Sequence, residues 1–292
     1  MDFRYASELL DLCEQHQCSI SQVMKVRECE ITETSMEYNL DRMAKALRIM
    51  KDSVNEAIIS PQKSMGGLIG GESQKIIDHL ASGKAIAGTL MTKAIAYSMG
   101  VLEVNACMGL IVAAPTAGSS GVLPGVLLAL QEEYEIPDDR LIDALFNASA
   151  IGYLAMQNAT VAGAVGGCQA EIGVASAMAA SAAVELLGGS PLQCTYAAST
   201  VLMNMLGLVC DPVGGLVEYP CQNRNAAGAA NAIVAAEMSL AGIHQLIPLD
   251  EMMDIMYTVG RKMPSELRET ALGGCATSPS ACARCKIGKQ IP

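Results

Sequence analysis

The chain has 292 residues, 51% of them hydrophobic, and a formal net charge of −11 at pH 7. This negative charge argues against nucleic acid as a partner, because nucleic-acid binding needs a basic surface. A membrane-spanning helix needs about 20 strongly apolar residues. The longest apolar stretches are broken, since residues 106–114 end at Pro115 and residues 172–189 contain Glu185. We therefore expect a buried core, no membrane span and no bound nucleic acid.

The cysteine count indicates the compartment. The chain has eleven cysteines, an odd number, and its first residues are charged, without the apolar stretch of a signal peptide. Disulfide frameworks need paired cysteines and an oxidising environment. The sequence therefore predicts a cytoplasmic protein with free thiols.

Residues 1–59 differ from the rest of the chain because they hold eleven of its thirty acidic residues. Apolar residues recur there at alternating spacings of four and three, which predicts one face of a long amphipathic helix: Met36, Leu40, Met43, Leu47, Met50 and Val54. Such a helix docks on the main body or a partner, or is an ordinary surface helix of the same domain. We expect residues 1–59 to form an N-terminal helical segment packed on a main body of residues 60–292.

After residue 60, helical patterns alternate with glycine-rich turns, and the period-two pattern of strands is scarce. Asp138 and Asp139 precede a helical pattern, which is typical of a helix N-cap. An alanine-rich helix is expected from about Arg224 to about Gly242, because alanine favours helix intrinsically. The sequence thus predicts a mainly α fold, a compact helical domain whose glycine-rich loops carry the site.

Three cysteines mark the candidate site. Cys168 follows a pair of glycines, and Cys210 and Cys221 bracket the Gly/Pro-rich residues 211–220. The surrounding residues 146–236 should be buried, because they contain only five charged side chains: Glu171, Glu185, Asp211, Glu218 and Arg224. Three sheltered thiols are typical of a soft-metal or iron–sulfur site with one position not filled by cysteine. Alternatively they are small apolar core residues, since their separations match no short ligand motif.

The segments around these cysteines resemble a known family. Residues 210–225 contain Cys-Asp-Pro-Val and Pro-Cys-Gln-Asn-Arg-Asn, and they are similar to the signature of the bacterial iron–sulfur L-serine dehydratases. The likeness is to the α subunit of the two-subunit form. Residues 64–72, 114–121 and 268–274 also match in the same order, so the resemblance extends from about residue 60 to about residue 275.

The resemblance implies a lyase that converts L-serine to pyruvate and ammonia, a step of amino-acid degradation. It implies a [4Fe–4S] cluster held by Cys168, Cys210 and Cys221, with one iron open to take the serine hydroxyl as a Lewis acid. Residues 60–292 would then be the iron–sulfur catalytic domain. A β subunit would complete a hetero-oligomer with this chain. Pyridoxal phosphate is not expected, because neither Lys75 nor Lys93 has a convincing context for it.

Arg224 is the only cation among residues 146–236. A cluster with three thiolates and the carboxylate of serine are both anionic, and the planar guanidinium suits a carboxylate. We therefore expect Arg224 to be catalytic, through the cluster or the substrate. A structural ion pair with Asp211 or Glu218 is the alternative. Asn223 and Asn225 are candidate donors to the cluster sulfides or to the substrate, and Asn225 is the predicted substrate-binding residue.

Two glycine-rich loops, residues 64–72 and 116–121, are candidate anion cradles, because glycine lets backbone N–H groups approach a carboxylate closely. Tight turns between helices are the alternative. The resemblance adds candidate substrate-binding residues in these loops: Ser64, Gly66, Thr116, Ser119 and Ser120. Glu72 and Lys75 follow the first loop and are candidate acid–base residues, with a surface ion pair as the alternative.

The sequence offers no histidine as a catalytic base. The three histidines lie in a charged segment, in a polar helix and beside an expected helix end, respectively: His16, His79 and His244. The two-subunit form explains this, because the β chain can supply the base.

The remaining cysteines have no defined role. Cys282 and Cys285 form a lone C-x-x-C, whereas a zinc knuckle would need a second pair, and Cys275 is only one more candidate. The others are expected to be core or incidental thiols: Cys13, Cys18, Cys29, Cys107 and Cys194. Two further functions stay open, a related iron–sulfur L-cysteine desulfidase and a non-catalytic zinc-binding scaffold protein.

Overall fold

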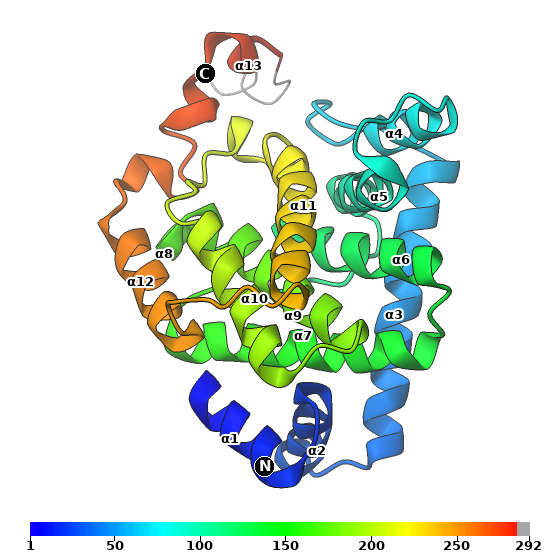
Figure 1. The fold of residues 1–292 in the computed structure, drawn as a ribbon. Coiled ribbons are helices and arrows are strands. Elements are labelled where there is room, and N and C mark those ends of the chain that lie inside the picture. The colour runs from blue at the N-terminus through cyan, green and yellow to red at the C-terminus, as the bar shows by residue number, and fades with distance from the viewer. Residues whose placement is uncertain (285–292) are drawn as a thin grey trace.

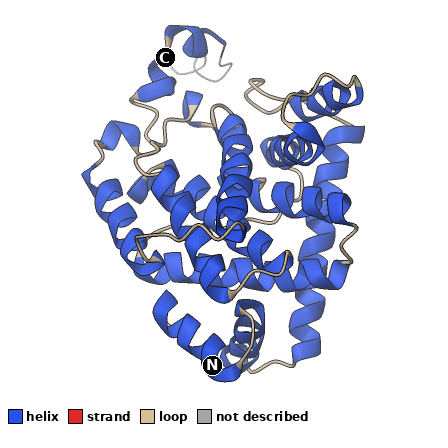
Figure 2. Cartoon of the chain, in the orientation of Figure 1, coloured by secondary structure: helices blue, strands red, loops and turns tan. Residues whose placement is uncertain are grey.

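The computed structural model describes residues 1–284, and its regular structure there is helical (Figures 1 and 2). Among these residues no strand forms, and the one β-type contact is an isolated parallel bridge between Cys210 and Arg268. The mainly α prediction is confirmed. Cys285, and with it the predicted C-x-x-C, lies outside the described residues. The helices are α1 (Ala6–His16), α2 (Ile20–Thr32), α3 (Met36–Ile59), α4 (Glu72–Ala81), α5 (Gly88–Ala106), α6 (Val122–Tyr134), α7 (Asp138–Asn158), α8 (Gly163–Gly166), α9 (Val174–Leu186), α10 (Pro191–Asn204), α11 (Cys221–Leu240), α12 (Leu249–Lys262) and α13 (Pro279–Arg284).

Helix α9 lies at the centre of the fold, and every one of its residues except Glu185 is buried. It packs against α6, α7, α10 and α11. Most of its side chains are alanine or serine, which add little volume, so the neighbouring helices can approach its backbone closely. The start of α9 is therefore held from several sides, and a short π-helical turn, Gln169–Gly173, leads directly into it.

The predicted amphipathic helix near the N-terminus is α3. It buries Leu47, Met50 and Val54 and packs on α5, α6 and α7. Helices α1 and α2 also contribute buried side chains to the same hydrophobic core as the later helices. These three helices therefore dock on the main body, while the division into two domains at residue 59 stays a prediction.

Two helix starts differ from the sequence-based prediction. Helix α7 begins at Asp138 itself, with Pro137 as its N-cap, so the aspartates lie in the first turn, where acidic side chains favour the helix dipole. The Asp138 side chain does not cap the helix, and it accepts hydrogen bonds from the side chains of Lys51 and Gln131. Helix α11 begins at Cys221 rather than near Arg224. This second difference places a candidate ligand in the first turn of a helix.

The regions that carry the predicted site meet where the π-helical turn packs against α11. The segment of residues 208–220 leads into α11, and residues 267–269 pair with the backbone of Cys210. None of the helices in the described range is long and apolar enough to cross a membrane.

Candidate active site

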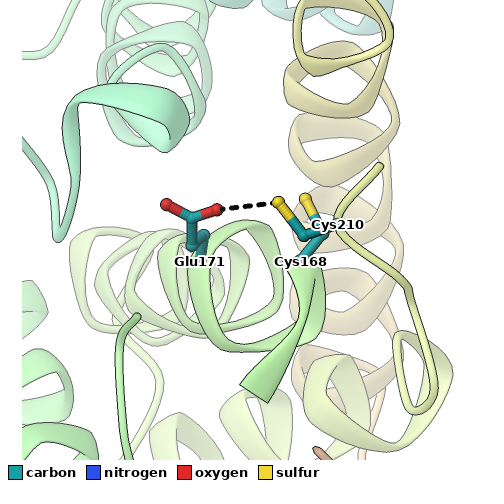
Figure 3. A group of neighbouring side chains, drawn as sticks. All are labelled: Cys168, Glu171 and Cys210. Carbon is teal, nitrogen blue, oxygen red and sulfur yellow. Dashed lines mark hydrogen bonds between the residues drawn. The ribbon is translucent and has the colours of Figure 1, made fainter. Parts of the chain in front are cut away.

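Two of the predicted ligand cysteines meet at the partly buried carboxylate of Glu171. The Sγ atoms of Cys168 and Cys210 and a carboxylate oxygen of Glu171 all lie within 4.8 Å of one another (Figure 3). The Cys210 thiol donates to Oε2 of Glu171 over 3.7 Å. Cys168 is 3% exposed and Cys210 is 4% exposed. Thiolate and carboxylate donors in one buried place are suited to a metal group.

The π-helical turn that follows Cys168 is fixed by close backbone contacts. Gly167 has a φ of +73°, and a Cβ there would lie 2.8 Å from the carbonyl oxygen of Leu208, so only glycine fits. The side chain of Gln169 donates to the Met256 carbonyl over 2.7 Å and accepts from the Gly207 N–H over 2.8 Å. Such π-helical turns are frequent at functional sites. Here the turn aims Cys168 and Glu171 at the same space.

Cys221, the third predicted ligand, is the first residue of α11 and is buried. Burial, followed by the charges of Cys168 and Glu171, raises the pKa of Cys221 to about 12, although Arg224 opposes this. The interaction with Cys168, followed by burial, also raises the pKa of Cys210. These thiols are close enough that three thiolates would repel one another strongly. The positive charge of a metal group would offset this repulsion. A thiol that coordinates such a group is deprotonated outright.

The backbone of Cys210 is hydrogen-bonded to the segment of residues 267–269. Its N–H donates to the Leu267 carbonyl over 2.8 Å, and its carbonyl accepts from the Glu269 N–H over 2.7 Å. The Nη1 of Arg268 reaches the Val165 carbonyl at 3.5 Å, and its buried Nε has no hydrogen-bond partner among the described residues. A buried guanidinium N–H without a partner suits a nearby anion. No role for Arg268 was predicted from the sequence.

Arg224 points to Asp211 and not to Glu218. Its Nη1 lies 2.7 Å from Oδ1 of Asp211 and donates to the Val209 carbonyl over 2.8 Å. Burial opposes the charge on Arg224, but the charges of Cys168 and Asp211 outweigh it and raise the pKa of the guanidinium. The structural ion pair with Asp211 is therefore present, and the arginine also neighbours the cysteines. Its catalytic role stays a prediction.

The first glycine-rich loop is held by a buried carboxylate. The Ser64 hydroxyl donates to Oε2 of Glu218 over 2.6 Å, and the Gly66 N–H donates to Oε1 over 2.6 Å. These two predicted substrate-binding donors therefore face Glu218, which lies three residues before Cys221. The structure brings the loop to the cysteine-bearing segment, and its contact with substrate stays a prediction.

Glu72 and Lys75 lie at the start of α4. Their side chains are 3.6 Å apart, and that of Lys75 is 73% exposed. Burial raises the pKa of Glu72, but hydrogen bonds from backbone N–H groups, that of Gly70 first, together with the nearby lysines lower it overall. The contact observed is the ion pair that the sequence analysis offered as the alternative, and the acid–base role stays a prediction.

The second glycine-rich loop reaches the cysteine group directly. The Thr116 hydroxyl donates to Oε1 of Glu171 over 3.0 Å and lies 3.0 Å from the Ser119 hydroxyl. A Cβ at Gly118 would lie 3.5 Å from the same carboxylate oxygen. Thr116 therefore contacts Glu171 directly, Ser119 contacts Thr116, and the predicted ligand Cys210 contacts the other carboxylate oxygen of Glu171.

Asn225 fixes this loop to α11. Its side-chain oxygen accepts from the Gly121 N–H over 3.0 Å, and its amide donates to the Gly118 carbonyl over 2.8 Å. Ser120 is fully buried, and its hydroxyl donates to the Ala117 carbonyl over 2.8 Å. Asn225 therefore holds the predicted substrate loop in place beside Cys221, four residues earlier in the same helix.

Glu171 is the candidate site residue that the sequence analysis missed. Burial raises its pKa, and the hydrogen bond from Thr116 offsets this only in part. A signal was present, because Glu171 follows Cys168 by three residues, a spacing that puts both on one helical face. It is also one of only four acidic residues in the charge-poor residues 146–236.

Cys168, Glu171 and Cys210 form a group that could hold a metal ion, and Cys221 lies at the start of α11, which packs against the same π-helical turn. The chain belongs to the serine dehydratase alpha chain family, whose model matches residues 15–276. It is 46% identical over 278 residues to the probable L-serine dehydratase, alpha chain, of Bacillus subtilis, covering 95% of this chain and 92% of that protein. The resemblance stated from the motifs is confirmed.

Two other relatives differ from each other in length. The L-serine dehydratase, alpha chain, of Peptoniphilus asaccharolyticus is 41% identical over 286 residues, which are 98% of this chain and 96% of that protein. The L-serine dehydratase of Helicobacter pylori is 37% identical over 285 residues, which are 94% of this chain but 61% of that protein. The match therefore covers 92% and 96% of the two alpha chains but 61% of the longer relative.

Proposed function

We propose that this chain is the α chain of an L-serine ammonia-lyase, which deaminates L-serine to pyruvate and ammonia. The observation that supports this most is the group formed by Cys168, Cys210 and Glu171, with Cys221 at the start of α11 near enough for these charges to act on it. The membership of the serine dehydratase alpha chain family and the names of its relatives agree with this activity.

The residues present fit a [4Fe–4S] cluster with three cysteine ligands and one open iron. Cys168, Cys210 and Cys221 would hold it, and when bound its open iron would act as a Lewis acid on the serine hydroxyl, which is otherwise a poor leaving group. The starts of two helices offer the positive ends of their dipoles to this anionic group. The Arg224 guanidinium and the unpartnered Nε of Arg268 add positive charge nearby.

The chain's own residues bind and orient the substrate. We propose that Thr116, Ser119 and Ser120 bind the serine carboxylate, with Asn225 keeping their loop in place. Without substrate, the Thr116 hydroxyl donates to Oε1 of Glu171 and Oε2 is directed at Cys210, so Thr116 would turn from Glu171 to donate to the serine carboxylate.

A β chain is proposed as the partner in a hetero-oligomer. The Bacillus and Peptoniphilus relatives are named alpha chains, and the Helicobacter relative extends well beyond the region that this chain matches. A second chain would supply the equivalent of that extra region and a place for the catalytic base. We also propose a cytoplasmic location, because the nine cysteines whose state is described are free thiols and oxidising compartments favour disulfides.

The test is pyruvate release from L-serine by anaerobically reconstituted protein, with and without the β chain. We expect the visible absorption of an iron–sulfur cluster, and pyruvate formation that is highest with the β chain. A colourless protein that retains zinc and has no turnover would instead support the scaffold alternative, because the filled d shell of zinc gives no such absorption. Faster turnover of L-cysteine than of L-serine would support the desulfidase alternative.

A further inference from the structure

Two buried carboxylates hold the loop of residues 64–73 against the start of α11. Glu218 is 3% exposed and lies in the segment between Cys210 and Cys221. Glu103 is 2% exposed and belongs to α5. Among the described residues, both carboxylates accept hydrogen bonds from neutral donors, namely backbone N–H groups, a serine hydroxyl and a glutamine amide. Buried carboxylates are costly unless such donors are in place, so these contacts are a specific feature of the fold.

Glu218 binds the first half of the loop. It accepts from the Ser64 hydroxyl and the Gly66 N–H, each over 2.6 Å, and from the Leu68 N–H over 3.1 Å. A Cβ at Gly66 would lie 2.9 Å from both carboxylate oxygens and 2.4 Å from Cδ1 of Leu216. The absence of a side chain at residue 66 therefore lets the loop close on Glu218.

Glu103 binds the second half of the loop and reaches α11 as well. It accepts from the Gly71 and Ser73 N–H groups, each over 2.9 Å, and so caps the start of α4. It also accepts from the side-chain amide of Gln222 over 2.8 Å. Gln222 directly follows Cys221, so the two carboxylates tie the loop to the chain on both sides of this cysteine.

We propose that Glu218 and Glu103 are positioning residues that couple the order of the loop to the binding of the cluster at Cys221. This inference rests on the proposed function only for the identity of the group that Cys221 binds. When the start of α11 is fixed by its ligand, the loop is held with it. Because such coupling is reciprocal, an ordered loop in turn favours retention of the iron.

The experiment is hydrogen exchange on the peptide that contains residues 64–73, in cluster-free and reconstituted protein. Glu218→Gln keeps the size of the side chain but replaces one acceptor oxygen with a donor. We expect its Gly66 and Leu68 amides to exchange at least about tenfold faster than in the unaltered protein when both are cluster-free. Reconstitution should slow exchange of the loop in the unaltered protein and have little effect in the variant, which should also lose iron faster.

Glu185→Gln is the matched control. Glu185 accepts from the Ser21 N–H over 3.2 Å and from the Asn147 amide over 2.6 Å, and so joins α9 to α2 and α7. This variant should lower the melting temperature without changing exchange in the loop or retention of iron. A merely structural role of Glu218 would give the same result as this control.

The proposal is overturned if the loop amides exchange at the same rate in cluster-free Glu218→Gln and in cluster-free unaltered protein. It is also overturned if reconstitution slows exchange of the loop to the same extent in both proteins. If Glu218→Gln does not fold, Ser64→Ala is used in its place. This variant removes one donor to Glu218 but keeps the carboxylate, and the same hydrogen-exchange measurement on the loop is made on it. If the unaltered protein binds no iron, the proposed cluster and its coupling to the loop both fail. Loop exchange in the cluster-free variants then still shows whether Glu218 holds the loop of residues 64–73.

Discussion

The three candidate ligand cysteines differ from the other thiols in what surrounds them. Cys168 and Cys210 share Glu171 as a neighbour, and burial with nearby negative groups raises the pKa of Cys221 to about 12. By contrast, Cys194 is fully buried beside Asn147, in the core of the helical body. Burial and the charge of Glu185 raise the pKa of Cys194 as well, so what separates the metal-binding candidates from small core thiols is the group that Cys168 and Cys210 form with Glu171.

Replacing Cys168, Cys210 or Cys221 with serine is expected to abolish both the visible absorption and serine turnover, because serine is a poor ligand for iron in such clusters. Cys194→Ser is the control, and it should keep both properties even if it lowers stability. Iron content, absorption and pyruvate release are measured on the same preparations. Full activity of Cys210→Ser would rule out the cluster assignment.

Arg224→Lys tests whether the arginine acts on the reaction or only supports the fold. Besides its contacts to Asp211 and the Val209 carbonyl, the arginine would grip the serine carboxylate or screen the cluster, and lysine keeps the charge but loses the planar fork for this. Loss of one charge-assisted contact costs about 2 kcal/mol, which corresponds to roughly a thirtyfold fall in kcat/KM. We expect this fall with the iron content unchanged.

The control is Arg140→Lys, since Arg140 also donates to a backbone carbonyl, that of Leu186, but on α7. It should leave kcat/KM unaltered. A lower melting temperature of Arg224→Lys with unchanged kcat/KM at full iron content would mean that the Asp211 pair is structural alone.

At the scale of elements, the site is built where helices begin. The π-helical turn that opens α9 carries Glu171, and α11 starts at Cys221, so two helix dipoles favour negative charge in the same space. The short helix α8 closes in from another side. A Cβ at Gly163 would lie 2.6 Å from Oε2 of Glu171 and 3.1 Å from Sγ of Cys210.

Gly163→Ala should therefore displace Glu171 or Cys210 and weaken cluster binding. Overpacking of this kind costs about 1–3 kcal/mol, and we expect a marked loss of iron after reconstitution with the helical content retained. Gly173→Ala is the control, because its nearest contact outside the adjacent residues would be at an ordinary 3.5 Å. Equal iron content in the two variants would contradict the close packing described for α8.

At the scale of the whole molecule, one continuous core supports the site. Side chains from α1 to α12 contribute to it, and alanine-rich α9 lies at its centre. Cys168 and Cys210 belong to this core, and the nine cysteines whose state is described are free, so none of these nine links distant parts of the chain by a disulfide. The fold should therefore survive loss of the metal group better than the activity does.

Exposure to air followed by iron chelation is expected to abolish serine turnover before the protein unfolds. An iron without a protein ligand is the most accessible part of the proposed cluster, whereas the helical core does not depend on it. Circular dichroism and pyruvate release are followed in parallel, and iron, sulfide and a reductant should restore turnover. Activity that persists after complete removal of iron would exclude the Lewis-acid role.

The sequence by itself determined the features that depend on nearby residues. The apolar spacing of Leu47, Met50 and Val54 predicted α3, because the period of a helix is expressed within a few turns. Scarce strand patterns and abundant alanine predicted the mainly α fold. The family was likewise recognisable from contiguous motifs around Cys210 and Cys221.

Only the tertiary structure decided which groups meet across the chain. Thr116 contacts Glu171 from 55 residues away, and Ser64 contacts Glu218 from 154 residues away. Arg224 could have paired with either Asp211 or Glu218, and the path of residues 211–220 placed Asp211 beside it and directed Glu218 to the loop. Such choices depend on how packed helices bring their connecting loops together. Local spacing does not encode this, because a hydrogen bond depends on distance in space and not on separation along the chain.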